Sequence, residues 1–152
     1  MIHILDNKET QKILEKLNKQ FGISKIPGFL IKIGQERIFL YQGNLNEKEI
    51  LNLAETIPVE RIGIYFAKVQ GDEIRLSIEG AQILKDSITK NVFELDEKQT
   101  EEWMMGKELN VSSGKKGFII MKHKNDFLGT GKASELKITN FIPKNRRLKE
   151  RG

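Results

Sequence analysis

The spacing of hydrophobic residues predicts two helices and a hairpin in the first third of the chain. Residues 8–20 place apolar side chains three or four positions apart, with lysine and glutamate between them, as in an amphipathic helix. Residues 29–33 and 37–41 are two short apolar runs on either side of a turn, which predicts a β-hairpin. Asn46 and Glu49 have the spacing of a capping box, so we expect a second helix to begin after Asn46.

The rest of the chain changes to shorter elements. Residues 62–67 form a nearly continuous apolar run, as expected for a central strand. After Gly71-Asp72 the pattern predicts short strands at 74–77, 91–95, 117–123, 127–133 and 136–142, with helices at 79–84 and 96–105. We therefore expect an α+β fold, in which a small α/β domain (residues 1–72) precedes a small β-barrel (residues 73–152) that packs against it.

Composition limits the class of protein. Of the 152 residues, 38% are hydrophobic and 31% are charged, which is typical of a globular chain and unlike a disordered one. The chain has no cysteine, which excludes disulfides, thiolate nucleophiles and cysteine zinc sites. We see neither a secretory signal nor a membrane-spanning stretch, so we expect a cytoplasmic protein with no membrane partner.

Charge is distributed unevenly. Residues 115–152 hold eleven Lys and Arg against three Asp and Glu, which leaves +8. Residues 1–114 hold fifteen Lys and Arg against eighteen Asp and Glu, which leaves −3. Only the C-terminal part therefore suits a polyanion such as RNA, because cations docked on phosphates release counterions. Ordinary solvated surface charge is the alternative.

Two strings in this basic part stand out. Residues 129–132 read Gly-Thr-Gly-Lys, but they are no phosphate-binding P-loop, because Asp126 and Ala133 stand where that motif needs Gly and Ser or Thr. The two glycines fit a β-bulge or barrel corner, and equally a place where an RNA backbone lies close to the protein. Lys122 and Lys124 alternate along a predicted strand, so we expect them to share one face.

Residues suited to catalysis are few. The two histidines lie in different halves, and no nucleophile motif or metal-binding spacing is present. The acids around residues 94–102 fit the start of a helix better than a catalytic pair. We expect Trp103 in the core, and Phe141 either closes the core or stacks on a base. No catalytic residue, metal or cofactor is predicted.

The second half resembles a PUA domain, a small RNA-binding barrel. The resemblance rests on residues 74–81, on the stretch from Val92 through Trp103 to Gly106, and on residues 117–121 leading into 127–133. The domain order resembles the Nip family of ribosome-assembly factors, which have a pre-PUA domain before the PUA domain. Residues 128–147 also resemble the RNA-binding tail of Sun/Nop-type rRNA methyltransferases, although no methyltransferase domain is present here.

The resemblance implies an α/β pre-PUA-like domain, a PUA-like barrel and RNA binding without catalysis. It implies that RNA contacts Gly129, Thr130, Gly131, Lys132, Lys144, Arg146 and Arg147. Charge alone adds Lys122 and Lys124 to this set.

The leading hypothesis is a non-enzymatic protein that binds rRNA in ribosome assembly, with tRNA as a second possible ligand. The N-terminal domain would then contact a partner protein. Three alternatives remain open: an RNA-specificity subunit acting in trans with a tRNA- or rRNA-modifying enzyme, an enzyme acting alone on RNA, and a protein-interaction module.

Overall fold

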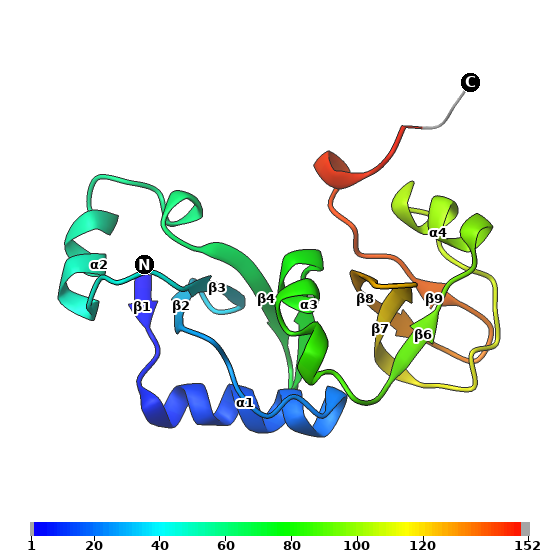
Figure 1. Cartoon of the computed structure of the whole chain (residues 1–152), viewed down its shortest axis with the longest axis horizontal. Coiled ribbons are helices and arrows are strands. Elements are labelled where there is room, and N and C mark those ends of the chain that lie inside the picture. Colours follow the sequence, from blue (N-terminus) through cyan, green and yellow to red (C-terminus); the bar gives the residue numbers. More distant parts are fainter. Residues whose placement is uncertain (1, 150–152) are drawn as a thin grey trace.

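The computed structural model describes residues 2–149. Met1 and residues 150–152 lie outside this range, and with them Arg151 at the end of the predicted basic tail. Two sheets, A and B, lie side by side along the long axis of the molecule (Figure 1).

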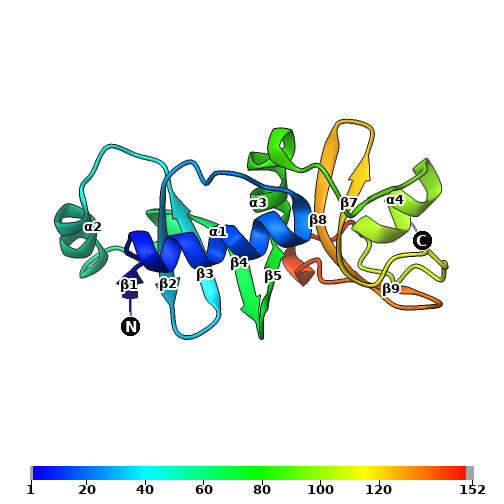
Figure 2. The same ribbon diagram turned by 90° about the horizontal axis from the view of Figure 1, so that it is seen from below.

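Sheet A is antiparallel throughout, and its strands pair in the order in which they occur in the chain. The strands are β1 (Ile2–Ile4), β2 (Phe29–Ile33), β3 (Arg37–Tyr41), β4 (Ile64–Gln70) and β5 (Glu73–Leu76). Helix α1 (Asn7–Phe21) crosses one face of this sheet, as Figure 2 shows. Helix α2 (Glu47–Ala54) and the short η1 (Val59–Arg61) connect β3 to β4.

Sheet B has the order β6-β7-β8-β9 and curls into a half barrel. Its strands are β6 (Val92–Glu94), β7 (Gly117–His123), β8 (Asp126–Ala133) and β9 (Ile138–Thr139); β6 pairs parallel with β7, and the other pairs are antiparallel. Helix α3 (Ile78–Ile83) and η2 (Lys85–Ser87) connect the two sheets, α4 (Glu97–Met104) follows β6, and η3 (Lys144–Arg146) follows β9. The α+β class predicted from the sequence is confirmed.

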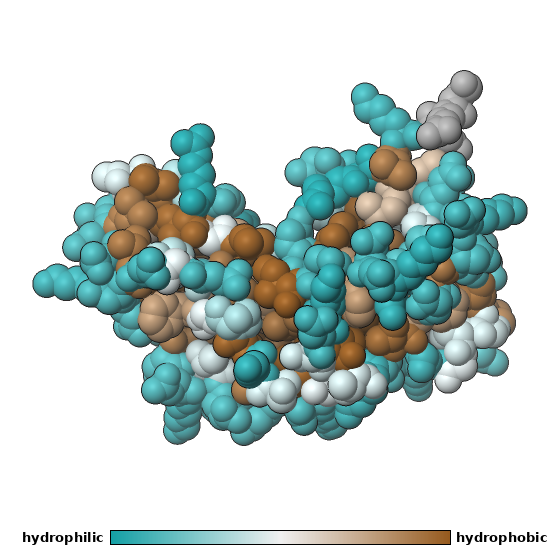
Figure 3. Space-filling model, viewed as in Figure 1, coloured by the Kyte–Doolittle hydropathy of each residue, from teal (hydrophilic) through white to brown (hydrophobic). Residues whose placement is uncertain are grey.

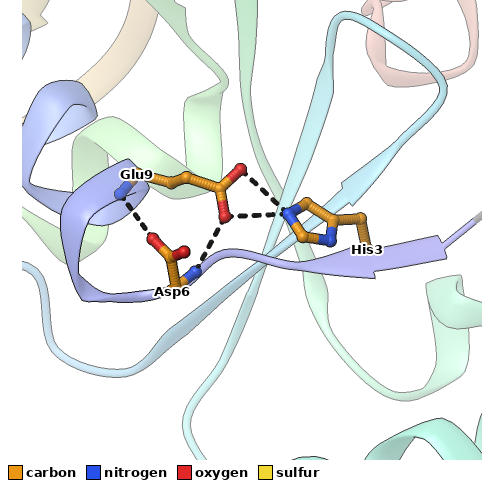
Figure 4. A network of polar contacts seen from close by, with 3 residues as sticks. All are labelled: His3, Asp6 and Glu9. Carbon is orange, nitrogen blue, oxygen red and sulfur yellow. Dashed lines mark hydrogen bonds and ion pairs between the residues drawn. The ribbon is translucent and has the colours of Figure 1, made fainter.

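The start of α1 shows how local sequence fixes an element. Asp6 is the N-cap, and its carboxylate accepts a hydrogen bond of 2.8 Å from the Glu9 backbone N–H. The Glu9 carboxylate accepts one of 3.1 Å from the Asp6 N–H, which completes a capping box. His3 on β1 lies 2.8 Å from the same carboxylate and ties the strand to the helix (Figure 4). The helix ends at Gly22, whose φ of 78° suits glycine.

The larger hydrophobic cluster joins the two sheets. Leu17 and Phe21 of α1 and Phe66 of β4 pack with Phe118 and Ile120 of β7 in one continuous core. A second cluster fills the half barrel around Trp103, which is fully buried and donates a hydrogen bond of 3.2 Å from its indole N–H to the Leu128 carbonyl. Trp103 is therefore a core residue, as predicted. Sheet B is covered on both faces.

The division expected between residues 72 and 73 falls at the turn between β4 and β5. These two strands pair with each other in sheet A, from Ala67 opposite Leu76 to Gln70 opposite Glu73. Strand β5 therefore belongs with the first sheet, and the chain leaves sheet A after Leu76 and enters sheet B at Val92.

The long strand predicted over residues 136–142 is wrong, because β9 covers Ile138–Thr139 alone. Asn140 ends the strand through its side chain. Its amide donates hydrogen bonds to the carbonyls of Trp103 (2.8 Å) and Lys107 (2.9 Å), and its oxygen accepts one of 2.8 Å from the Ile142 N–H. The other predicted helices and strands form within a few residues of their expected positions. Within residues 2–149, no helix combines the length and the apolar character that a membrane crossing needs.

Candidate nucleic-acid interface

The glycine string of β8 lies in the interior. Gly129 has a φ of 82° and lies against Ile78, where β8 has an extra residue relative to β7. The Thr130 side chain is 4% exposed, and its hydroxyl donates a hydrogen bond of 2.9 Å to the Leu76 carbonyl. A Cβ at Gly131 would lie 2.8 Å from Trp103 and 2.6 Å from Ile138. The structure thus gives these residues a packing role, and their contact with RNA stays a prediction.

Lys132 follows this string and is exposed. Its ammonium lies 5.6 Å from the centre of the Phe118 ring, a cation–π distance. It borders a groove of about 1160 Å³, called the lysine groove below, which also holds Lys115 and Lys116. Strand β8 and the loop before β7 place these three cations around one hollow.

Lys122 and Lys124 lie near the tip of the β7–β8 hairpin. Lys122 lies on β7, with its ammonium 5.4 Å from the centre of the Phe127 ring. Lys124 lies beyond the strand in a left-handed turn with a φ of 53°, and its backbone N–H donates a hydrogen bond of 3.0 Å to Glu94. The alternation expected to place both lysines on one strand face therefore stops at His123.

The C-terminal cations are held by the fold more firmly than a free tail would be. Arg146 forms an ion pair with Glu79 at the start of α3. Arg147 donates a hydrogen bond of 2.9 Å from Nε to the Ile142 carbonyl and lies over Gly106. Lys144 is exposed. Arg147 is exposed as well, and its hydrogen bond holds the segment against Ile142.

Most of the basic residues of this region lack a neutralising acid. Between Lys115 and Lys149, the described part of the chain contains two ion-paired cations: Lys137, which lies 2.9 Å from Glu108, and Arg146. The remaining cations do not form one patch. They lie in three places: the lysine groove, the hairpin tip, and the C-terminal segment beside α3.

The structure also contains a cleft that sequence reasoning missed. It measures about 470 Å³ and lies between sheet A and the C-terminal segment. We call it the arginine cleft, and its lining includes Tyr65, Arg75, Glu79, Phe141 and Arg146. Figure 3 shows the molecule hollowed along its upper edge, with hydrophobic residues at the floor of the hollow and hydrophilic residues on both sides.

Arg75 is the central cation of the arginine cleft. Its guanidinium carbon lies 4.3 Å from the centre of the Phe141 ring, and Phe141 in turn meets Phe118 edge to face at 6.1 Å. Burial lowers the pKa of Arg75, because desolvation disfavours its charged form. Phe141 therefore both packs on the core and carries a half-buried cation, and sequence reasoning considered only the first of these roles.

Arg75 belongs to a row of cations on the face of sheet A opposite α1, where α2 and η1 cover only part of the sheet. Arg37, Lys68 and Arg75 are direct neighbours on three adjacent strands. Glu60 lies 3.2 Å from Arg37, and Glu36 lies 3.4 Å from Lys68, whereas Arg75 has no carboxylate at ion-pair distance within residues 2–149. In the sequence, Arg75 is marked only by its position between the apolar Ile74 and Leu76, which predicts that it faces away from the core.

Aromatic rings continue this face. Phe39 and Tyr65 lie 5.6 Å apart between ring centres, and the Arg37 guanidinium lies 5.3 Å from the Phe39 ring. Burial raises the pKa of Tyr65. Its hydroxyl has no hydrogen-bond partner among the described residues.

Two of the acids in residues 94–102 have structural roles, since Glu94 accepts the hydrogen bond from Lys124 and Asp96 begins a helix. Asp96 caps α4 and accepts a hydrogen bond of 2.7 Å from the Gln99 N–H, as expected for a helix start. Within residues 2–149, no three side chains of the types that bind metals gather into a site.

Comparison with known proteins supports the predicted resemblance. Residues 90–148 match the family described as the methyltransferase RsmF PUA domain. The match begins at residue 90, after β5 and α3, and so covers sheet B and the C-terminal segment. The likeness to the PUA-like tail of Sun-type rRNA methyltransferases is thereby confirmed.

Relatives extend the likeness to most of the chain. Over 140 residues, the chain is 26% identical to ribosomal RNA small subunit methyltransferase F of Vibrio cholerae serotype O1 (strain M66-2), a match that covers 91% of this chain. It is 28% identical over 141 residues to the protein of the same name from Aeromonas salmonicida (strain A449), covering 92% of this chain. The chain spans about 28% of the length of these relatives.

Proposed function

We propose that this protein is an RNA-binding module that does no chemistry itself and that takes ribosomal RNA as its ligand, with tRNA as the second candidate. Assembly of the ribosome is the setting we propose for it. The PUA-like half supplies the binding surface through its lysine groove, hairpin tip and C-terminal segment.

The observation that carries this proposal is the surplus of unpaired cations. Lys115, Lys116 and Lys132 border one groove, and none of them has an acidic partner within the part of the chain that is described. A phosphate backbone would supply the missing anions and release its own counterions. Of the residues predicted for RNA contact, Lys122, Lys124, Lys132 and Lys144 have ammonium groups that form no ion pair there.

A second function is favoured by the relatives. These relatives are named ribosomal RNA small subunit methyltransferase F, and this chain matches about 28% of their length. A module of this kind would hold RNA for an RNA-modifying enzyme that acts in trans. Co-purification of the protein with a methyltransferase activity would favour this function over assembly alone. Contact between the N-terminal part and a partner protein also stays a proposal.

The experiment is a titration of rRNA-fragment affinity against salt. We expect log affinity to fall linearly with log salt, and a slope near zero would reject the proposal. Replacing Lys115, Lys116 and Lys132 together by Gln should reduce the slope by roughly 2–3, because each cation on a phosphate contributes about 0.7–0.9.

The matched control replaces three exposed lysines of α1, Lys8, Lys12 and Lys19, by Gln. It changes the net charge equally and leaves the lysine groove intact. An equal drop in slope for both triple variants would mean that net charge, and not this groove, determines the binding.

A further inference from the structure

A half-buried guanidinium without an acidic partner points to a ligand in the arginine cleft. The guanidinium of Arg75 lies over the ring of Phe141, and burial partly removes its charge from water. The acids near it are already paired, since Glu79 binds Arg146, Glu60 binds Arg37 and Glu36 binds Lys68. The charge of Arg75 is thus available to an anion from outside the described chain.

The lining of the cleft specifies the ligand further. Tyr65 presents a ring and an unpartnered hydroxyl beside Arg75, while Ile64 at the edge is 42% exposed. Aromatic rings and guanidinium planes are surfaces on which nucleobases stack, and a base can use them only when it is unpaired. A volume of about 470 Å³ lies within the range of small-molecule sites.

The cleft is also positioned to share a ligand with the basic half. Its far wall is the C-terminal segment from Phe141 to Arg146, which holds two of the cations predicted for RNA contact. Figure 1 shows this segment (red) above α3, with sheet A to its left. RNA bound along the C-terminal segment would therefore pass over the mouth of the cleft.

We propose that the arginine cleft receives an unpaired nucleotide of the bound RNA, with its base against Arg75 and Tyr65 and its phosphate beside Arg75 and Arg146. This inference rests on the proposed function and adds to it that the N-terminal sheet is half of the RNA site. The module then selects single-stranded or bulged RNA over a regular duplex.

The test compares two RNAs by fluorescence anisotropy at one salt concentration: a short unstructured RNA, and the same strand annealed to its complement. Arg75→Met should weaken binding of the single strand about tenfold, which is the loss in affinity expected when one base no longer stacks. The affinity for the duplex should stay nearly unchanged. Arg75→Lys keeps the charge without the flat guanidinium, so it should lie between Arg75→Met and the wild type.

The matched control is Arg37→Met on the same sheet face. Arg37 is paired with Glu60 and does not line the cleft, so its loss should alter affinity by less than about twofold. Circular dichroism on each variant checks that the fold is retained. If Arg75→Met fails to fold, Arg75→Lys decides the question.

The outcomes separate this inference from the proposed function. A wild-type protein that binds neither RNA in low salt overturns the proposed function itself. Salt-dependent binding that Arg75→Met leaves intact, or weakens equally for single strand and duplex, overturns the cleft assignment alone. Loss of a bound partner protein in Arg75→Met, with RNA affinity preserved, would assign the cleft to protein and likewise overturn it.

Discussion

The two sheets differ in how completely their faces are covered. Sheet A has α1 on one face, whereas α2 and η1 cover only part of the other face and leave Arg37, Lys68 and Arg75 beside them. Sheet B has the shared core on one face and the Trp103 cluster on the other. Sheet B therefore presents its cations near strand ends and in loops, whereas part of one face of sheet A displays a row of cations.

This difference shows that net charge by segment is an incomplete guide to a binding surface. The final third of the sequence carries the surplus of +8, but its strands are largely buried. The first part carries a net negative charge, yet it contributes the half-buried Arg75. A ligand bound by both halves would meet a surface that the net charge of neither half predicts.

The largest effect should come from truncating the centre of the cluster that fills sheet B. Trp103→Ala removes a fully buried ring and its hydrogen bond, at a cost of about 3–5 kcal/mol in the free energy of unfolding. Tyr65→Ala at the border of the cluster on sheet A should cost about 1–2 kcal/mol, because its side chain is only half-buried. Urea unfolding measures both, and equal costs would contradict the comparison of the two sheets.

A smaller effect tests why residue 131 is glycine. Gly131→Ala places a methyl group against Trp103 and Ile138, which should destabilise the fold by about 1–3 kcal/mol. The neighbouring exposed Lys132→Ala should stay within about 0.5 kcal/mol and serves as the control. If Gly131→Ala retained full stability and instead lost RNA affinity, close approach of an RNA backbone would explain this glycine better than packing.

A buried hydrogen bond links sheet B to sheet A. Thr130→Val removes a buried hydroxyl that donates from β8 to the Leu76 carbonyl of β5, and should cost about 1–2 kcal/mol. Thr139→Val, on β9 and only partly buried, is the matched control. Both are measured by urea unfolding, and equal values would mean that the hydroxyl contributes little to docking of the two sheets.

The smallest effect is a pH dependence confined to the edge of sheet A. The Asp6 backbone N–H, and then His3, hold the pKa of Glu9 below its ordinary value of 4.5. Because the folded pKa is lowered, this contribution to stability is present above about pH 4.5 and is lost as pH falls through the folded pKa. The midpoint of thermal unfolding should thus fall more between pH 5 and pH 3 in the wild type than in Glu9→Gln, and parallel curves would contradict the capping role.

Local sequence was enough to predict most elements. The Asp6–Glu9 and Asn46–Glu49 boxes begin helices at the expected positions, because capping depends on residues three apart in the chain. The strand expected to reach residue 142 failed for the opposite reason. Asn140 ends it by bonding to carbonyls more than thirty residues away, and no local pattern carries that information.

The candidate RNA site was likewise predicted only in part from the sequence. Sequence alone determined that the cations gather near the C-terminus, because composition is a property of the chain itself, and its resemblance to PUA domains is confirmed over residues 90–148. Only the tertiary structure decided that Thr130 and Gly131 turn inward and that Arg75 meets Phe141 across sixty-six positions. Packing selects which side of each strand is covered, and that choice depends on which elements from elsewhere in the chain lie against it.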